Sequence, residues 1–181
     1  MPEVWLKSNR RALAFGMVLP LALLLTGLAM SGLAVPVGTA WVRAAGWCLA
    51  IASLLPLGLL LRELRRPRLA YADGELLVYL RPGAPYRVPL DVVECFLLGQ
   101  GPTMLPGRER EAETVNVIVR LAERAEQWSF REIKPVLGNW CGSSITLRGT
   151  WCEPLDLATV NRLNARLDAV RRPSRDAQVA S

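Results

Sequence analysis

The sequence predicts an α+β membrane protein, in which a two-helix hairpin precedes an antiparallel β domain that ends in an amphipathic helix. Three observations predict this architecture. Between Arg11 and Arg62 the only charged residue is Arg43. From residue 69 onward, short apolar runs alternate with turn residues, and the last apolar residues of the chain recur at helical spacing. We therefore expect an apolar anchor followed by a folded domain.

The apolar region contains two segments that are each long enough to cross a bilayer. Residues 12–42 and 44–61 carry no charge, and a helix needs about 20 apolar residues to span a hydrocarbon core of about 30 Å. Glycine, proline and hydroxyl residues gather at 31–39 and predict a turn there. The expected transmembrane spans are therefore about 12–33 and 41–61.

Basic residues flank both ends of this hairpin. The flanking segments hold Glu3 and Glu63 against seven basic residues: Lys7, Arg10, Arg11, Arg62, Arg65, Arg66 and Arg68. Basic flanks stay on the cytoplasmic side of a membrane, so both termini are expected in the cytoplasm. The same seven residues are candidates for contact with anionic lipid head groups, although fixing the topology is the stronger interpretation. Since only two of the 22 basic residues are lysine, the composition suggests a bacterial origin. The transmembrane hairpin is then expected in the bacterial inner membrane.

Composition also excludes several classes of function. The chain carries a net charge of +6, but residues 69–181 hold 14 basic and 14 acidic residues, so the domain lacks the basic surface of a nucleic-acid-binding protein. There is no histidine, which removes the commonest general base and most catalytic zinc sites. The four cysteines show no CxxC spacing. We expect no catalytic site, no metal and no cofactor.

A cleaved signal peptide is the alternative interpretation of the first apolar segment. Its basic start and the small residues at 27–29 fit such a peptide. However, the apolar stretch exceeds the 7–15 residues that are usual for signal peptides, and the second segment supplies a hairpin partner. The transmembrane interpretation is therefore preferred.

The domain reads as a series of short strands. Asp73-Gly74, flanked by apolar runs at 68–72 and 75–80, predicts a hairpin with a tight type I′ turn. Runs at 86–90 and 92–98 predict a second hairpin. Further strands are expected at 114–121, 128–133 and 145–151, with loops at 99–113 and 134–144.

The last element is an amphipathic helix over residues 154–172. Its apolar residues Leu157, Val160, Leu163, Leu167 and Val170 recur at helical spacing. Asp156 near its start and the two arginines at its end suit the helix dipole. We expect the helix to lie along an open edge or mouth of the sheet, followed by a disordered tail at 173–181.

Two segments resemble bacterial PH-like (pleckstrin-homology-like) domains that are anchored in membranes. Residues 69–78, LAYADGELLV, look like the opening hairpin of that family, and residues 86–96, YRVPLDVVECF, look like its later strand and turn. The resemblance covers residues 68–98 and extends to the position of the last helix. It implies a partly open β-barrel capped by that helix, with no catalytic site to carry over.

The expected organisation is a cytoplasmic N-terminus (1–11), a transmembrane hairpin (12–61), a basic junction (62–68) and a PH-like domain (69–172). Function must be argued from sites, because one fold serves many functions. We expect a non-catalytic adaptor that presents the domain to a protein or a lipid head group. The expected partners are the lipid bilayer and a protein, with self-association as a further option and no nucleic acid. A structural subunit of a membrane complex, and less so a membrane enzyme or transporter component, are the alternatives.

Overall fold

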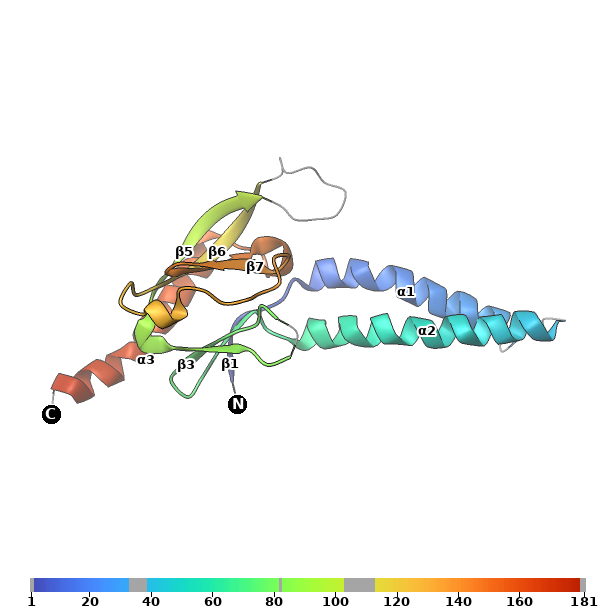
Figure 1. Cartoon of the computed structure of the whole chain (residues 1–181), viewed down its shortest axis with the longest axis horizontal. Coiled ribbons are helices and arrows are strands. Elements are labelled where there is room, and N and C mark those ends of the chain that lie inside the picture. The colour runs from blue at the N-terminus through green and yellow to red at the C-terminus, as the bar shows by residue number, and fades with distance from the viewer. Residues whose placement is uncertain (1, 33–38, 82, 103–112, 180–181) are drawn as a thin grey trace. The chain divides into compact units, whose positions relative to one another are not determined.

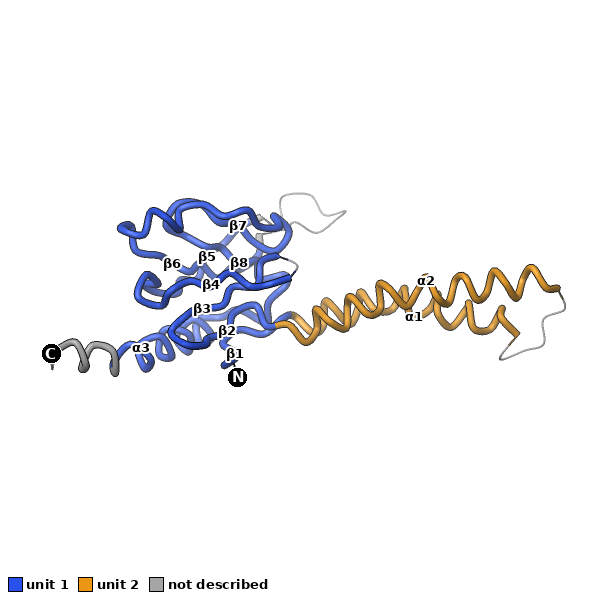
Figure 2. Tube along the Cα trace, turned by 60° about the horizontal axis from the view of Figure 1, so that its bottom comes forward, with its two compact units in different colours: residues 1–8, 67–181 blue, residues 9–66 orange. Residues whose placement is uncertain are grey.

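The computed structural model describes residues 2–32, 39–81, 83–102 and 113–179 and has an α+β architecture. The chain divides into two compact units, shown in two colours in Figure 2. Residues 9–66 form a helical unit, and residues 1–8 and 67–181 form a β unit. The helical unit is thus inserted into the chain of the β unit.

The helical unit is a pair of helices, α1 (Arg10–Met30) and α2 (Ala40–Arg65). Both helices are long and apolar enough to cross a membrane. The side chain of Asn9 caps the first turn of α1 by accepting hydrogen bonds from the amides of Arg11 and Ala12 at 3.1 and 3.2 Å. The predicted spans are confirmed as helices, while residues 33–38, most of the predicted turn, lie outside the described residues.

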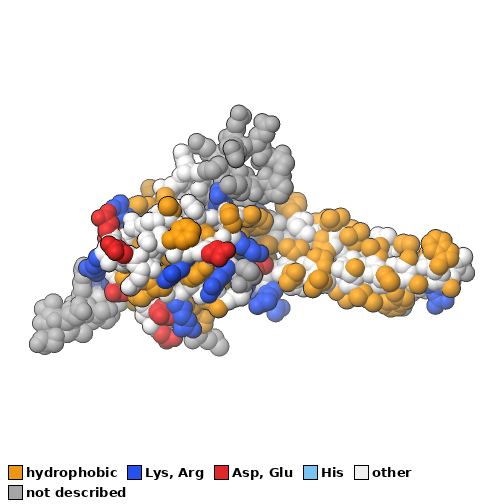
Figure 3. Space-filling model, viewed as in Figure 1, with side chains coloured by type: hydrophobic (Ala, Val, Ile, Leu, Met, Phe, Trp, Pro, Cys, Tyr) orange, Lys and Arg blue, Asp and Glu red, His pale blue; other side chains and the backbone are white. Residues whose placement is uncertain are grey.

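Glycines allow α1 and α2 to approach each other closely. A Cβ atom on Gly27 would lie 2.6 Å from the amide nitrogen of Ala50, and one on Gly46 would lie 2.7 Å from the carbonyl oxygen of Gly27. Small residues permit this kind of packing between membrane helices. Most of the remaining surface of the pair is exposed and apolar, as the hydrophobic side chains along it in Figure 3 show.

The first sheet of the β unit has the strand order β1-β2-β3-β4. Its strands are β1 (Glu3–Leu6), β2 (Leu69–Ala72), β3 (Glu75–Val78) and β4 (Tyr86–Pro89), all antiparallel. The predicted hairpin turn is confirmed, since Asp73 and Gly74 have φ values of 52° and 81°. Strand β1 was not predicted, because it precedes the apolar helices and contains only four residues.

The second sheet has the order β5-β6-β8-β7. Its antiparallel strands are β5 (Val93–Pro102), β6 (Glu113–Leu121), β7 (Gly138–Cys141) and β8 (Ser144–Arg148). In Figure 1, β5 and β6 form a long twisted ribbon. Residues 103–112, most of the predicted 99–113 loop, lie outside the described residues, while residues 99–102 belong to β5.

Within the described residues no ladder joins the two sheets, so they form no closed barrel, and the expected barrel was itself only partly open. The following predictions about the strands are wrong. The predicted second hairpin does not form, because a 3-10 turn, η1 (Leu90–Val92), carries the chain from β4 in the first sheet to β5 in the second. Residues 128–133 hold no strand, and β7 lies instead within the predicted 134–144 loop. Short apolar runs do not distinguish a strand from a loop that packs on a core.

The C-terminal helix α3 (Leu157–Val179) runs past residue 172, where the amphipathic pattern predicted its end. Its apolar face is confirmed, because Val160, Leu163 and Leu167 are buried, whereas Leu157 is exposed. These side chains join one core with residues of both sheets. Trp5 of β1 and Phe96 of β5 meet edge to face in that core, with ring centroids 6.1 Å apart.

Candidate functional site

Helix α3 covers the outer edge of β5 with polar side chains. The amide of Phe96 donates a hydrogen bond to Oδ1 of Asn164 at 2.8 Å, and Nδ2 of Asn164 donates one to the carbonyl of Phe96 at 2.9 Å. The asparagine side chain therefore makes the two backbone hydrogen bonds that a neighbouring strand would make with Phe96. Further along the helix, the guanidinium of Arg171 donates to the carbonyls of Leu90, Val93 and Glu94. An edge that is paired in this way is protected against uncontrolled strand addition.

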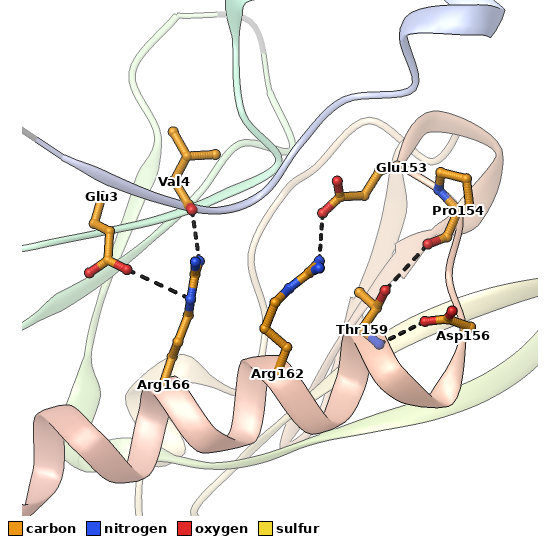
Figure 4. A network of polar contacts seen from close by, with 8 residues as sticks. All are labelled: Glu3, Val4, Glu153, Pro154, Asp156, Thr159, Arg162 and Arg166. Carbon is orange, nitrogen blue, oxygen red and sulfur yellow. Dashed lines mark hydrogen bonds and ion pairs between the residues drawn. The ribbon is translucent and has the colours of Figure 1, made fainter.

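The same helix also holds the edge of the first sheet. Arg166 donates to the carbonyl of Val4 in β1 at 2.9 Å and forms an ion pair with Glu3 at 3.7 Å, as Figure 4 shows. Asn164 and Arg166 thus contact edge strands of different sheets. The expectation that the helix lies along an open edge is confirmed, and the structure adds that it closes the side between β1 and β5.

The start of α3 is fixed by a capping residue. The amide of Thr159 donates to Oδ1 of Asp156 at 2.7 Å, and Arg162 forms an ion pair with Glu153 at 3.0 Å (Figure 4). Hydrogen bonds from the side chain and backbone of Thr159 lower the pKa of Asp156 below its ordinary value of 3.8. Asp156 therefore holds its charge at the positive end of the helix dipole.

The opposite side of the β unit is closed by the segment that leads into β7. The Tyr86 hydroxyl donates to the carbonyl of Glu132, and Nε1 of Trp140 donates to the carbonyl of Trp128 at 2.6 Å. The rings of Tyr86 and Trp140 pack edge to face with centroids 5.2 Å apart. This segment therefore connects β4, the last strand of the first sheet, with β7, the last strand of the second.

The basic residues predicted as a membrane-facing site differ in their surroundings. Lys7, Arg10, Arg11, Arg62 and Arg65 are exposed. Arg66 forms an ion pair with Glu63 at 3.2 Å, and its side chain is 15% exposed. Arg68 is 3% exposed and lies in the core of the β unit. Six of the seven residues therefore have some access to solvent, whereas Arg68 does not reach the surface.

Arg68 has a structural role inside the β unit. Its Nε donates to the carbonyl of Trp151 at 3.1 Å, and its backbone amide donates to the carbonyl of Leu6 at 2.8 Å. The guanidinium also lies near the buried thiol of Cys152. Burial raises the pKa of that thiol to about 12, despite the opposing effect of the nearby positive charge. Cys152 is therefore an inert thiol at neutral pH.

A polar groove of about 770 Å³ lies at the end of the β unit that contains the β2–β3 turn. It brings together three carboxylates, those of Asp91, Glu94 and Glu123. Two of them share one partner, because Arg120 lies 3.3 Å from Glu94 and 3.8 Å from Glu123. The groove thus presents paired charges of both signs.

The described part of the chain contains no cluster of three or more side chains that is suited to a metal ion. Comparison with known proteins gives no further assignment, since no family model, no curated protein and no solved structure matches the chain. The function must therefore be argued from the architecture and the surfaces described above.

Sequence reasoning missed two features of these surfaces. Strand β1 could have been suspected from Val4-Trp5-Leu6, an apolar run with a large aromatic residue ahead of a basic flank. The bridging role of Asn164 carries no signal in the sequence, because an asparagine beside the apolar face of a helix is usually exposed. Asn164 can form this bridge only because the edge of β5 lies beside it in the folded structure.

Proposed function

We propose that the protein is a non-catalytic adaptor anchored in the bacterial inner membrane, which presents a PH-like domain to the cytoplasm. The observation that carries the proposal is the position of the helical pair in the chain. Strand β1 lies before α1, strand β2 follows α2, and the two strands pair with each other in one sheet. A domain built from both ends of a membrane hairpin is held at the bilayer without a long linker.

Strand pairing also supports the topology. The carbonyl of Leu6 accepts a hydrogen bond from the amide of Arg68 at 2.8 Å, so the chain segments on either side of the hairpin adjoin. Two spans return the chain to the side from which it started, which agrees with basic residues on both flanks. The cytoplasm is the side that these basic flanks favour.

The same pairing argues against a cleaved signal peptide. Cleavage near residue 29 would remove β1 and with it Trp5 and Leu6, which are 2% and 0% exposed. Loss of a buried aromatic residue costs about 3–5 kcal/mol by itself, a large part of the stability of a small domain. Because Trp5 and Leu6 belong to the core of the β unit, a retained anchor is favoured over a cleaved signal peptide.

The PH-like assignment rests on the order of elements. Two antiparallel sheets followed by a C-terminal helix that covers the side between them agree with the capped, partly open β-fold that the resemblance implies. The two quoted segments form the β2–β3 hairpin and the β4–η1–β5 transition. The strand ahead of the hairpin is an addition to that pattern.

The groove is the best surface for a protein partner. The edges of β1 and β5 are held by α3, and the segment before β7 connects β4 to β7, so strand addition is less favoured than it was from sequence alone. By contrast, the groove offers Asp91 and Arg124, which form no ion pair with any described residue. Polar groups of both signs give an interface its specificity.

Two experiments test the proposal. First, membranes that contain the full chain are washed with alkaline carbonate, beside a variant in which a short Gly-Ser linker replaces residues 9–66. The full chain should stay in the pellet and the variant should be soluble, whereas extraction of the full chain by carbonate would refute the anchor.

Second, a photo-crosslinking amino acid is placed at Glu123 in the groove and, as a control, at Asn161 on the exposed face of α3. An adaptor should give one protein adduct from Glu123 and none from Asn161. If a protein co-purifies in stoichiometric amount but crosslinks from neither position, the structural-subunit alternative is correct.

A further inference from the structure

One end of the β unit is defined by the points where the chain passes to and from the apolar helices. Backbone hydrogen bonds connect neighbouring segments there. The amide of Arg68 donates to the carbonyl of Leu6 at 2.8 Å, and the carbonyl of Arg68 accepts from the amide of Tyr79 at 3.1 Å. The amide of Lys134 donates to the carbonyl of Leu80 at 3.2 Å. The segment at 134 therefore lies at the same end as residues 6 and 68. We call this the entry end.

The entry end carries exposed cations that no carboxylate neutralises. Arg81 and Lys134 are exposed and form no ion pair with any described residue. Arg81 stacks over the Tyr86 ring at 4.3 Å, and its Nε donates to the carbonyl of Ala84 at 3.0 Å. This stacking holds the Arg81 guanidinium in place, and its positive charge can still attract an anion from solution. Arg81 and Lys134 come from separate loops, and the backbone bond to Leu80 brings them together.

Two further cations and an apolar side chain belong to the same end. Nε of Arg148 donates to the carbonyl of Pro135 at 2.8 Å, next to Lys134. Lys7 is exposed, and its carbonyl accepts a hydrogen bond from the amide of Glu153 at 3.0 Å. Val136, which is 45% exposed, lies beside Lys134. Cations around a small apolar side chain are typical of surfaces that contact a lipid interface.

Carboxylates at the entry end reduce this charge only in part. Glu153 forms an ion pair with Arg162, Asp156 caps α3, and Glu132 is exposed. At the opposite end, around the groove, Asp73 and Asp91 are exposed and form no ion pair with any described residue. The entry end therefore holds the unneutralised cations Arg81 and Lys134, while the groove holds exposed carboxylates together with Arg124, which forms no ion pair with any described residue.

We infer that the entry end is a lipid-contacting surface, in which Arg81 and Lys134 bind the head groups of an anionic bilayer. The inference rests on the proposed membrane anchor, because the chain leaves the β unit for α1 and α2 at this end. It adds residues from within the folded domain to the basic flanks of the hairpin. Attraction of this kind is worth about fivefold in binding per basic residue near an anionic surface.

Lys134 is a natural probe of this surface, because the chain has only two lysines. The full-length protein is placed in nanodiscs of purely zwitterionic lipid or of lipid with about one third phosphatidylglycerol, an anionic fraction chosen to give a strong surface potential. An uncharged polyethylene glycol N-hydroxysuccinimide ester then modifies exposed amines. Peptide mass spectrometry gives the rate at Lys134.

The inference predicts that modification of Lys134 is slower by about fivefold in the anionic discs. A matched control is Asp168→Lys, which places a lysine on the exposed face of α3 away from the entry end. Its rate should be the same in both lipids. Arg81→Gln, which removes a neighbouring cation, should reduce the protection of Lys134.

Two results would overturn the inference. They are equal rates at Lys134 in the two lipids, and equal slowing at Lys134 and at the control lysine. Failure of the membrane anchor would appear differently, as protein that does not elute with the discs at all. The two claims can therefore fail separately.

Discussion

Asn164 and Phe96 form a closed pair of hydrogen bonds between helix α3 and the edge of strand β5. Both the donor and the acceptor of the Phe96 backbone are satisfied by one side chain, at 2.8 and 2.9 Å. The contact fixes the helix against the second sheet, while Arg166 fixes it against the first. The stability of the β unit should therefore depend on this asparagine more than on other polar residues of the helix.

Asn164→Ala should lower the free energy of unfolding by about 1–2 kcal/mol, because it leaves a partly buried amide and carbonyl without partners. The control Asn161→Ala changes an exposed residue of the same helix and should alter stability by less than about 0.5 kcal/mol. Urea titration in mild detergent, followed by tryptophan fluorescence, measures both. Equal effects of the two substitutions would show that the Asn164 contact contributes nothing.

Trp5→Ala tests whether the first residues belong to the domain. Trp5 is 2% exposed and stacks on Tyr71 with centroids 5.5 Å apart. Its truncation should cost about 3–5 kcal/mol and make the β unit sensitive to trypsin. Val4→Ala, at a residue that is 40% exposed, should leave protease resistance nearly unchanged. A Trp5→Ala protein that resists trypsin as the wild type does would show that β1 is dispensable.

Gly46→Ala tests the contact between α1 and α2. The added methyl group would lie 2.6 Å from the amide nitrogen of Ser31 and 2.7 Å from the carbonyl of Gly27, so the helices must separate. The expected cost is about 1–3 kcal/mol, seen as a lower midpoint of thermal unfolding in detergent. Gly58→Ala is the matched control, since nothing lies within 4 Å of its added methyl group. If both variants unfold alike, the close helix contact is absent.

Asp156→Asn tests the electrostatic part of the α3 cap. The pKa of Asp156 is lowered by its bonds to Thr159, so the folded state favours the carboxylate. Its stabilising effect is present above the ordinary aspartate pKa of 3.8 and is lost as the pH falls through the lower, folded value. Asparagine keeps the capping hydrogen bond but has no charge. The variant should therefore unfold more easily than the wild type at pH 7.

The difference in stability between Asp156→Asn and the wild type should shrink below about pH 4. Asp168→Asn removes a charge from the same helix without touching the cap, and at pH 7 it should change the stability by less than Asp156→Asn does. Thermal unfolding across pH measures all three proteins. A constant gap between Asp156→Asn and wild type at all pH values would contradict the electrostatic explanation.

Local patterns predicted those elements whose cause is local. The Asp73-Gly74 turn, the two apolar helices and the buried face of α3 all follow from spacing and turn chemistry within a few residues. Strand β1 pairs with β2, and the whole helical hairpin lies between them in the sequence. A strand of four residues is too short for its sequence pattern to predict such a pairing. For the same reason β7 was placed in a loop, since its four residues gain their strand character from pairing with β8.

The candidate site was predictable only in outline. The exposed flanking basic residues follow from composition, but the burial of Arg68 depends on the carbonyl of Trp151, which is far away in the sequence. Likewise, the entry end joins Arg81 and Lys134, which are brought together by one backbone hydrogen bond. Contacts between distant segments decide which of the many basic residues come together at one end of the β unit.

The central claim is that the two helices form a membrane hairpin with β1 and the rest of the β unit on the cytoplasmic side. The most direct test is the activity of topology reporters fused before residue 1, after residue 181 and within the segment between α1 and α2. The account predicts cytoplasmic signals from both termini and a periplasmic signal from the segment between the helices. Termini on opposite sides of the membrane would contradict it, because β1 could not then pair with β2.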